Sequence, residues 1–178
     1  NTFDTDQILT WTQSAGECSG STATITARFN QPSTATDLNA YSMDTECWVW
    51  GGLTSSDYST ASNWYKYDGS KWLRQTTATP GASDKVYVLG NTNAGLCVSS
   101  SNNLAVTTGT MMSNFMVASG ATADLSGSIA VTGDITNDGT VNCGTSSLTM
   151  SGTSDQTISG NSTSLYNITV NKSSGNLI

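Results

Sequence analysis

The sequence predicts an all-β protein: a parallel β-helix, or solenoid, preceded by an aromatic-rich β cap. Apolar residues almost never recur at helical spacing, whereas β-branched residues interrupted by Gly and Asn dominate. Short apolar-x-apolar triplets recur in the C-terminal half, some with a period near twenty residues. Four of the five tryptophans lie between Trp48 and Trp72. We therefore divide the chain into an N-terminal β segment of unknown type (1–47), an aromatic cap motif (48–88) and β-helix coils (89–178).

The triplets define the predicted coils, because each places two apolar side chains on one face of a short strand. Gly, Asn and Ser corners separate them. The triplets begin at Leu96, Leu104, Phe115, Ile129, Val141, Leu148 and Ile168.

A longer register links some of these triplets. Ile129, Leu148 and Ile168 are 19 and 20 residues apart, and the same spacing separates Val131, Met150 and Val170. A fixed period of this length is typical of stacked coils, with like residues about 4.8 Å apart in a ladder. Antiparallel hairpins are the alternative, since Asn137-Asp138-Gly139 also suits a type I′ turn.

The aromatic motif stands just before the first regular coil. An open solenoid end would expose its apolar core and an unpaired strand edge, so it must be covered. Large aromatic side chains cover the most area per residue, about 150 to 250 Å² each. We expect Trp50, Trp64 and the segment 80–88 to form this cap, with Asp84 in a turn before the strand at 86–89.

Two stretches resemble a known group of proteins. Residues 48–88, which include "WVWGG", "SSDYS", "NW" and "PGASDKVYV", resemble the W-x-G…S-x-D-[WY]-S…NW…P-G-x-x-D-x-V motif of bacterial (chiefly Bacteroidetes) and some archaeal secreted cell-surface proteins. Residues 146–178, "SSLTMSGTSDQTISGNSTSLYNITVNKSSGNLI", are similar to their recurring coil. The resemblance implies a β-helix in a surface module with a structural or adhesive role, and it supplies no catalytic residues.

Composition excludes several partners and favours an extracellular location. Charged residues make up 11% of the chain, and Thr and Ser roughly a third. The net charge of −7 argues against nucleic acid as a partner. No apolar run approaches the roughly 20 residues of a membrane span. The chain begins at Asn1 without an initiator Met, and we expect a processed chain or a fragment of an exported protein.

The residues offer little for catalysis, and we predict that the protein is not an enzyme. The chain has no His, so a His-based nucleophile or base is excluded. Polysaccharide cleavage on a β-helix would need clustered carboxylates, but the candidates stand beside Gly or Ser and are interpreted as turn residues: Asp124, Asp134, Asp138 and Asp155. No cofactor is predicted. Calcium is retained only as a weak alternative, at Asp4 with Asp6 or at Asp134 with Asp138.

Other candidate sites involve aromatics, cysteines and glycosylation. Most aromatics are assigned to the core, but alternation along "NWYKYDGSKW" leaves Tyr65, Tyr67 and Trp72 as candidates to bind a glycan. Cys18 and Cys47 have two alternative interpretations: they form a disulfide, or each is a small buried thiol. If Cys97 and Cys143 stack two coils apart, they are too distant for a disulfide and are free. Glycosylation sequons begin at Asn161, Asn167 and Asn171.

Three functions remain open. We favour an extracellular, non-enzymatic surface module for structure or adhesion, whose partners are copies of itself or neighbouring surface proteins. The first alternative is a subunit of an extracellular filament or lattice, joined when residues 1–12 add a strand to a neighbour's open sheet edge. The second is a carbohydrate-binding module that uses the aromatic motif.

Overall fold

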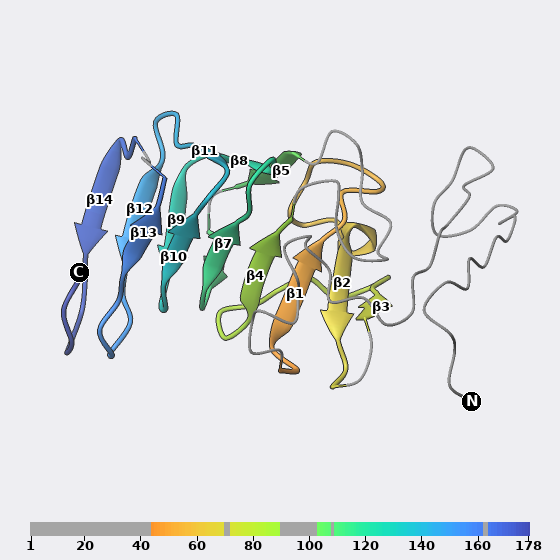
Figure 1. Cartoon of the computed structure of the whole chain (residues 1–178), viewed down its shortest axis with the longest axis horizontal. Helices are drawn as coiled ribbons and strands as arrows, with labels where there is room; N and C mark the ends of the chain where they lie inside the picture. Colours follow the sequence, from red (N-terminus) through yellow and green to blue (C-terminus); the bar gives the residue numbers. More distant parts are fainter. Residues whose placement is uncertain (1–43, 70–71, 90–102, 108, 162–163) are drawn as a thin grey trace, which may run out of the picture.

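The computed structural model describes residues 44–69, 72–89, 103–107, 109–161 and 164–178, and these form an all-β solenoid. Short strands stand side by side along the long axis, from β14 at one end to β3 at the other (Figure 1). A 3₁₀ turn, Ala61–Asn63, interrupts the strands. Among the described residues, no helix has the length and apolar character needed to cross a membrane.

Three sheets form the walls. The first has seven strands in the order β13-β10-β7-β4-β1-β2-β3, the second has three in the order β11-β8-β5, and the third has four in the order β14-β12-β9-β6. The first sheet contains β1 (Cys47–Trp50), β2 (Trp64–Tyr67), β3 (Trp72–Arg74), β4 (Lys85–Val88), β7 (Phe115–Val117), β10 (Ile135–Asn137) and β13 (Ile158–Gly160). The second contains β5 (Asn103–Val106), β8 (Thr122–Leu125) and β11 (Thr140–Asn142), and the third contains β6 (Met111–Met112), β9 (Ser128–Val131), β12 (Ser147–Met150) and β14 (Asn167–Val170).

The predicted solenoid and its register are confirmed in the four-stranded sheet. Ile129 pairs with Leu148, and Leu148 pairs with Ile168, all in parallel. Val131, Met150 and Val170 pair in the same way. Inward side chains therefore stack in columns, which is the arrangement that the period of 19 and 20 residues predicted.

The antiparallel alternative is wrong for the coils. Asn137-Asp138-Gly139 connects β10 to β11, and these strands belong to different sheets. The segment is thus a corner of a coil. A Cβ atom on Gly139 would collide with the carbonyl oxygens of Ala118 and Ala121 in the preceding coil. The glycine is needed for this close approach rather than for a hairpin turn.

Several strands, among them β10 and β13, lack the apolar triplets from which the coils were predicted. In β10 the inward pair is Ile135 and the buried Asn137, and β13 pairs Ile158 and Gly160 with them. The Asn137 side chain accepts a hydrogen bond from the Gly139 N–H at 3.2 Å. A polar residue can take an inward position here because the adjoining corner supplies its donor.

The larger of two hydrophobic clusters in the described chain runs from the cap into the coils. It includes Trp48, Trp50 and Trp64 of the cap and continues through Val86 and Phe115 to Met150 in the last coils. The cap and the coils also share the seven-stranded sheet, in which β1 pairs in parallel with β4 and antiparallel with β2. A buried aromatic cluster thus stands where the sequence predicted the cap.

The corner at Gly152 allows a direct test of coil stacking. A Cβ atom there would collide with the carbonyl oxygen of Thr132 in the preceding coil. We expect Gly152→Ala to lower the free energy of unfolding by about 2 to 3 kcal/mol, measured by urea denaturation, because backbone must shift to admit the methyl group. Gly81→Ala is the control, since the nearest atom to its new methyl, Asp84 Oδ2, is 3.7 Å away. Equal losses in the two variants would contradict this account of the corner.

Candidate functional site

The aromatic motif divides into a buried cluster and a partly exposed pair. Trp64 is fully buried at the centre of the cluster, with its ring centroid 4.9 Å from those of Trp50 and Tyr58 and 6.5 Å from that of Trp48. All three contacts are edge-to-face, the geometry that aromatic rings prefer. Lys66 Nζ lies 4.9 Å from the centre of the Trp48 ring. The cluster is a packed core and offers no open ring face to a ligand.

Asn63 organises the loop that brings Tyr58 to this cluster. Its Oδ1 accepts hydrogen bonds from the backbone N–H groups of Thr54 and Ser55 at 2.7 and 3.1 Å. Its Nδ2 donates to Ser55 Oγ and to the Asp57 carbonyl. The indole N–H of Trp64 donates to the Tyr58 carbonyl at 2.8 Å. The S-x-D-Y and N-W elements of the motif are therefore parts of one folded loop.

On the outer face of the same sheet, the prediction for Tyr65 is corrected. Tyr65 is only 4% exposed and packs with Val49 and Tyr87, so it cannot offer a stacking surface. This face carries buried apolar residues as the inner face does, which strand alternation alone does not reveal. Tyr67 and Trp72 are half-buried, and their ring centroids are 5.2 Å apart at an angle of 48°. These two side chains remain the candidate ligand-binding pair.

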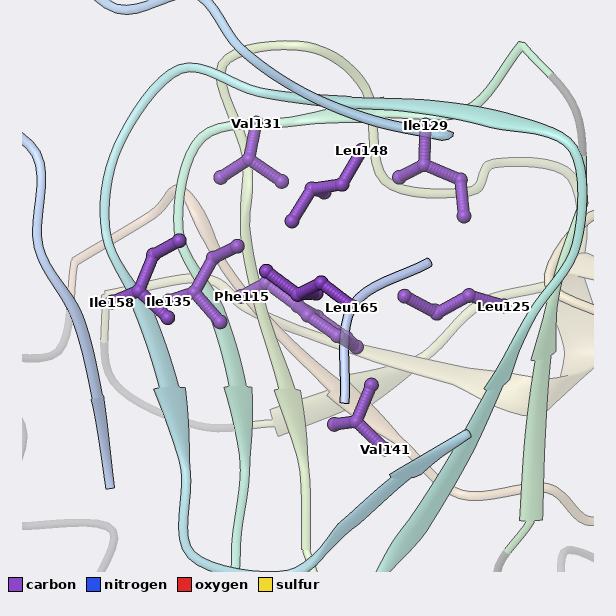
Figure 2. Close-up of a pocket in the computed structure, with 9 residues that line it drawn as sticks. All are labelled: Phe115, Leu125, Ile129, Val131, Ile135, Val141, Leu148, Ile158 and Leu165. Carbon is purple, nitrogen blue, oxygen red and sulfur yellow. The ribbon is translucent and has the colours of Figure 1, made fainter. Parts of the chain in front are cut away.

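A small void lies in the interior of the solenoid, between the described strands. Figure 2 shows nine apolar side chains directed into it, eight from the three sheets and Leu165 from the connection before β14, with Phe115, Ile135 and Ile158 on one wall and Leu125 and Val141 on another. The cavity measures about 10 Å³, which is space for at most one water molecule, and its lining is wholly apolar. This void is a packing defect and not a binding pocket.

The candidate acidic residues make hydrogen bonds between consecutive coils. Asp124 Oδ1 accepts from Asn142 Nδ2 at 2.6 Å, and Oδ2 accepts from Asn103 Nδ2 at 2.8 Å. Asp134 accepts from the Thr157 N–H at 2.8 Å, and Asp155 accepts from the Asn176 N–H at 2.7 Å. Asp138 is exposed at its corner. Within the described residues, no three His, Cys, Asp or Glu side chains are grouped to hold a metal, and Asp4 and Asp6 lie outside them.

Gln156 is a further coil-to-coil link; composition and spacing gave no role to it, although a glutamine stands at this position in the coil that residues 146–178 resemble. This fully buried side chain donates to the carbonyls of Val131 and Gly133 and accepts from the Gly152 N–H. Lys172 Nζ donates to its Oε1 at 2.7 Å and to two carbonyl oxygens, those of Gly152 and Ser154. All four donor and acceptor positions of the amide are used, as a buried polar group requires.

The described cysteines are buried thiols. Cys47 and Cys143 are both free, and burial raises the pKa of each above the ordinary value. A buried, protonated thiol is a weak nucleophile. Cys18, the predicted partner of Cys47, lies outside the described residues, as does Cys97. The side chain of Cys47 approaches Asp44, whose pKa is held below its usual value chiefly by the hydrogen bond from Lys85.

The sequon asparagines Asn161, Asn167 and Asn171 are all exposed and stand in or beside the last coil. Asn161 Nδ2 donates to the Asp138 carbonyl at 2.7 Å. A glycan on any of the three would therefore be attached near the C-terminal end of the solenoid.

That end of the solenoid exposes apolar side chains. Among the described residues, β14 lies at a sheet edge and pairs only with β12. Ile168 and Val170 continue the buried columns of Leu148 and Met150, yet they are 42% and 54% exposed. Tyr166 and Ile178 are exposed too. The proposed donor strand for such an edge, residues 1–12, lies outside the described residues.

Comparison with protein-family models, with curated proteins and with solved structures gives no match for this chain. The site is therefore interpreted from its own geometry.

The two classes of aromatic residue predict different effects of truncation. We expect Trp64→Ala to lower the free energy of unfolding by about 3 to 5 kcal/mol, because it opens a cavity among three other rings. Trp72→Ala removes a half-buried ring that packs against Tyr67 and the cluster around Tyr65, and it should cost about 1 to 2 kcal/mol. Chemical denaturation followed by circular dichroism measures both. Similar losses would contradict the division into core cluster and surface pair.

Proposed function

We propose that the chain is an extracellular, non-enzymatic module that serves a structural or adhesive role at a cell surface. The observation that carries the proposal is the use of its carboxylates. Asp124, Asp134 and Asp155, which a cleaving enzyme would need to gather at one site, each hydrogen-bond an adjacent coil. Side chains committed to joining coils suit a stiff spacer in which each coil contacts its neighbours.

Two features of the sequence support the extracellular part of the proposal. The surface chemistry is dominated by Thr, Ser and Asn, with few charges. The aromatic motif and the last coil resemble segments of secreted surface proteins that place such a cap before a β-helix. The proposed partners are neighbouring surface proteins or further copies of the chain.

Single replacement of the candidate acids tests the structural assignment. Asp134→Ala and Asp155→Ala should each lower the free energy of unfolding by about 1 kcal/mol, because each leaves a backbone N–H of the next coil without its partner. Asp138→Ala is the matched control, since this aspartate is equally exposed but its side chain makes no hydrogen bond to another coil among the described residues. Urea denaturation measures stability, and reducing-end and unsaturated-product assays on a polysaccharide panel measure turnover. Turnover by the wild type that falls in any of these variants would overturn the proposal.

Carbohydrate recognition is the second candidate function, favoured by the Tyr67–Trp72 pair. Two half-buried rings with centroids 5.2 Å apart are suited to contact the apolar face of a sugar. This candidate rests on the pair alone, since Tyr65 is buried.

A glycan array followed by calorimetry on any hit tests this candidate. We expect Trp72→Ala to abolish binding, because half of the platform is lost, while the folded state is retained. Leu73→Ala is the control: Leu73 is 42% exposed on the same strand, but alternation directs it to the opposite face. An array without hits, or equal effects of both substitutions, would remove carbohydrate binding from consideration.

A further inference from the structure

The Tyr67–Trp72 pair has a fixed geometry because its two residues are cross-strand partners. β2 and β3 pair antiparallel at the cap end of the long axis, with Tyr67 directly opposite Trp72 (Figure 1). Residues that lie opposite one another in such a pair project from the same face of the sheet. Both side chains are half-buried and pack against the cluster that includes Val49 and Tyr65. The strand pairing and this packing together hold the two rings at a set distance and angle.

The angle between the two rings restricts the surfaces that both can contact at once. Their planes are inclined by 48°, and their centroids are 5.2 Å apart. Two rings at this angle cannot both lie against one flat surface. The separation of the centroids is close to the length of one sugar residue in a polysaccharide. Each ring can therefore stack on a different residue of one chain, provided that the two sugar rings are inclined to each other as well.

Neighbouring aromatic residues do not extend the pair into a flat platform. Of the described tryptophans and tyrosines, only Tyr67, Trp72 and Tyr166 are more than 8% exposed. Tyr166 lies beside β14, at the opposite end of the long axis (Figure 1). The flat face of a crystalline polysaccharide would need several rings in one plane, and the described part of the cap has no such row.

We propose that the Tyr67–Trp72 pair binds a polysaccharide chain whose consecutive sugar rings are inclined to each other, a specificity that rests on the carbohydrate-binding function proposed for the same two residues. Chains of α-1,4-linked or β-1,3-linked glucose have this bent form and wind into open helices. Chains of β-1,4-linked glucose are flat ribbons whose rings are nearly parallel, so they can stack on only one ring of the pair at a time.

Charge favours a neutral polysaccharide. The net charge of −7 repels acidic polymers such as polyuronates. Arg74 is two residues from Trp72 on the same face of β3. Its Nε–H donates to the carbonyl of Ser62 at 3.1 Å, which ties the guanidinium to the 3₁₀ turn of the cap. We therefore expect the affinity to come from stacking on neutral sugar rings.

Calorimetric titration of the whole chain with three linkage isomers tests the proposal. Maltohexaose, laminarihexaose and cellohexaose are glucose hexamers that differ only in their linkages, which are α-1,4, β-1,3 and β-1,4. We expect the first two to bind about 3- to 10-fold more tightly than cellohexaose, because cellohexaose loses one of the two ring contacts. Cellulose powder should not retain the protein in a sedimentation assay.

Variants of Tyr67 test whether the two rings together set this preference. Tyr67→Ala leaves only the indole of Trp72, and a single ring cannot distinguish bent from flat chains, so the preference should disappear. Tyr67→Phe keeps the ring and removes the hydroxyl group, so the preference should remain. Leu73→Ala, on the opposite face of β3, should also retain it. Circular dichroism verifies that each variant is folded.

The possible results distinguish this specificity from carbohydrate binding itself. If no hexamer binds and a glycan array gives no hits, both the carbohydrate-binding function and the specificity are wrong. Equal or tighter binding of cellohexaose, array hits confined to flat β-1,4-linked chains, or tighter binding of oligogalacturonate would overturn the specificity alone. A preference for bent chains that is lost in Tyr67→Phe would also overturn it, because the hydroxyl group and not the ring would then be responsible.

Discussion

The structure depends on the stacking of like residues from one coil to the next. Ile129, Leu148 and Ile168 occupy one column, and the parallel ladder of backbone hydrogen bonds fixes their spacing. The hydrophobic effect and the ladder act along the same axis, so each coil is stabilised chiefly by the coils beside it. A substitution that changes the spacing between coils, such as the added methyl group of Gly152→Ala, disturbs the apolar packing and the hydrogen-bond ladder together.

This constraint explains where the polar residues lie. The corners bring backbone groups of adjacent coils together, and their donors and acceptors must be satisfied. Gln156 meets that requirement inside the core, and Asp134 and Asp155 meet it outside. Asn63 has the same task in the cap loop. Side chains that are familiar from active sites here serve to hold backbone in place.

The same constraint makes the two ends unequal. The outermost strands of a solenoid leave apolar core and strand edges that another element must cover. At one end, β2 and β3 turn the seven-stranded sheet antiparallel, and the rings around Trp64 cover the core. At the other, Ile168 and Val170 remain exposed in register.

The sequence by itself determined the all-β class, the solenoid and the register of the four-stranded sheet, because inward apolar pairs recur there with a nearly constant period. It did not reveal β10 and β13, whose inward positions hold Asn137 and Gly160, since their suitability depends on hydrogen bonds and close contacts from other coils. Nor did alternation reveal that Tyr65 is buried, because both faces of the cap sheet carry buried apolar residues. Periodicity indicates which residues share a face of a strand. Only the packed structure shows whether that face is buried and which residues it contacts.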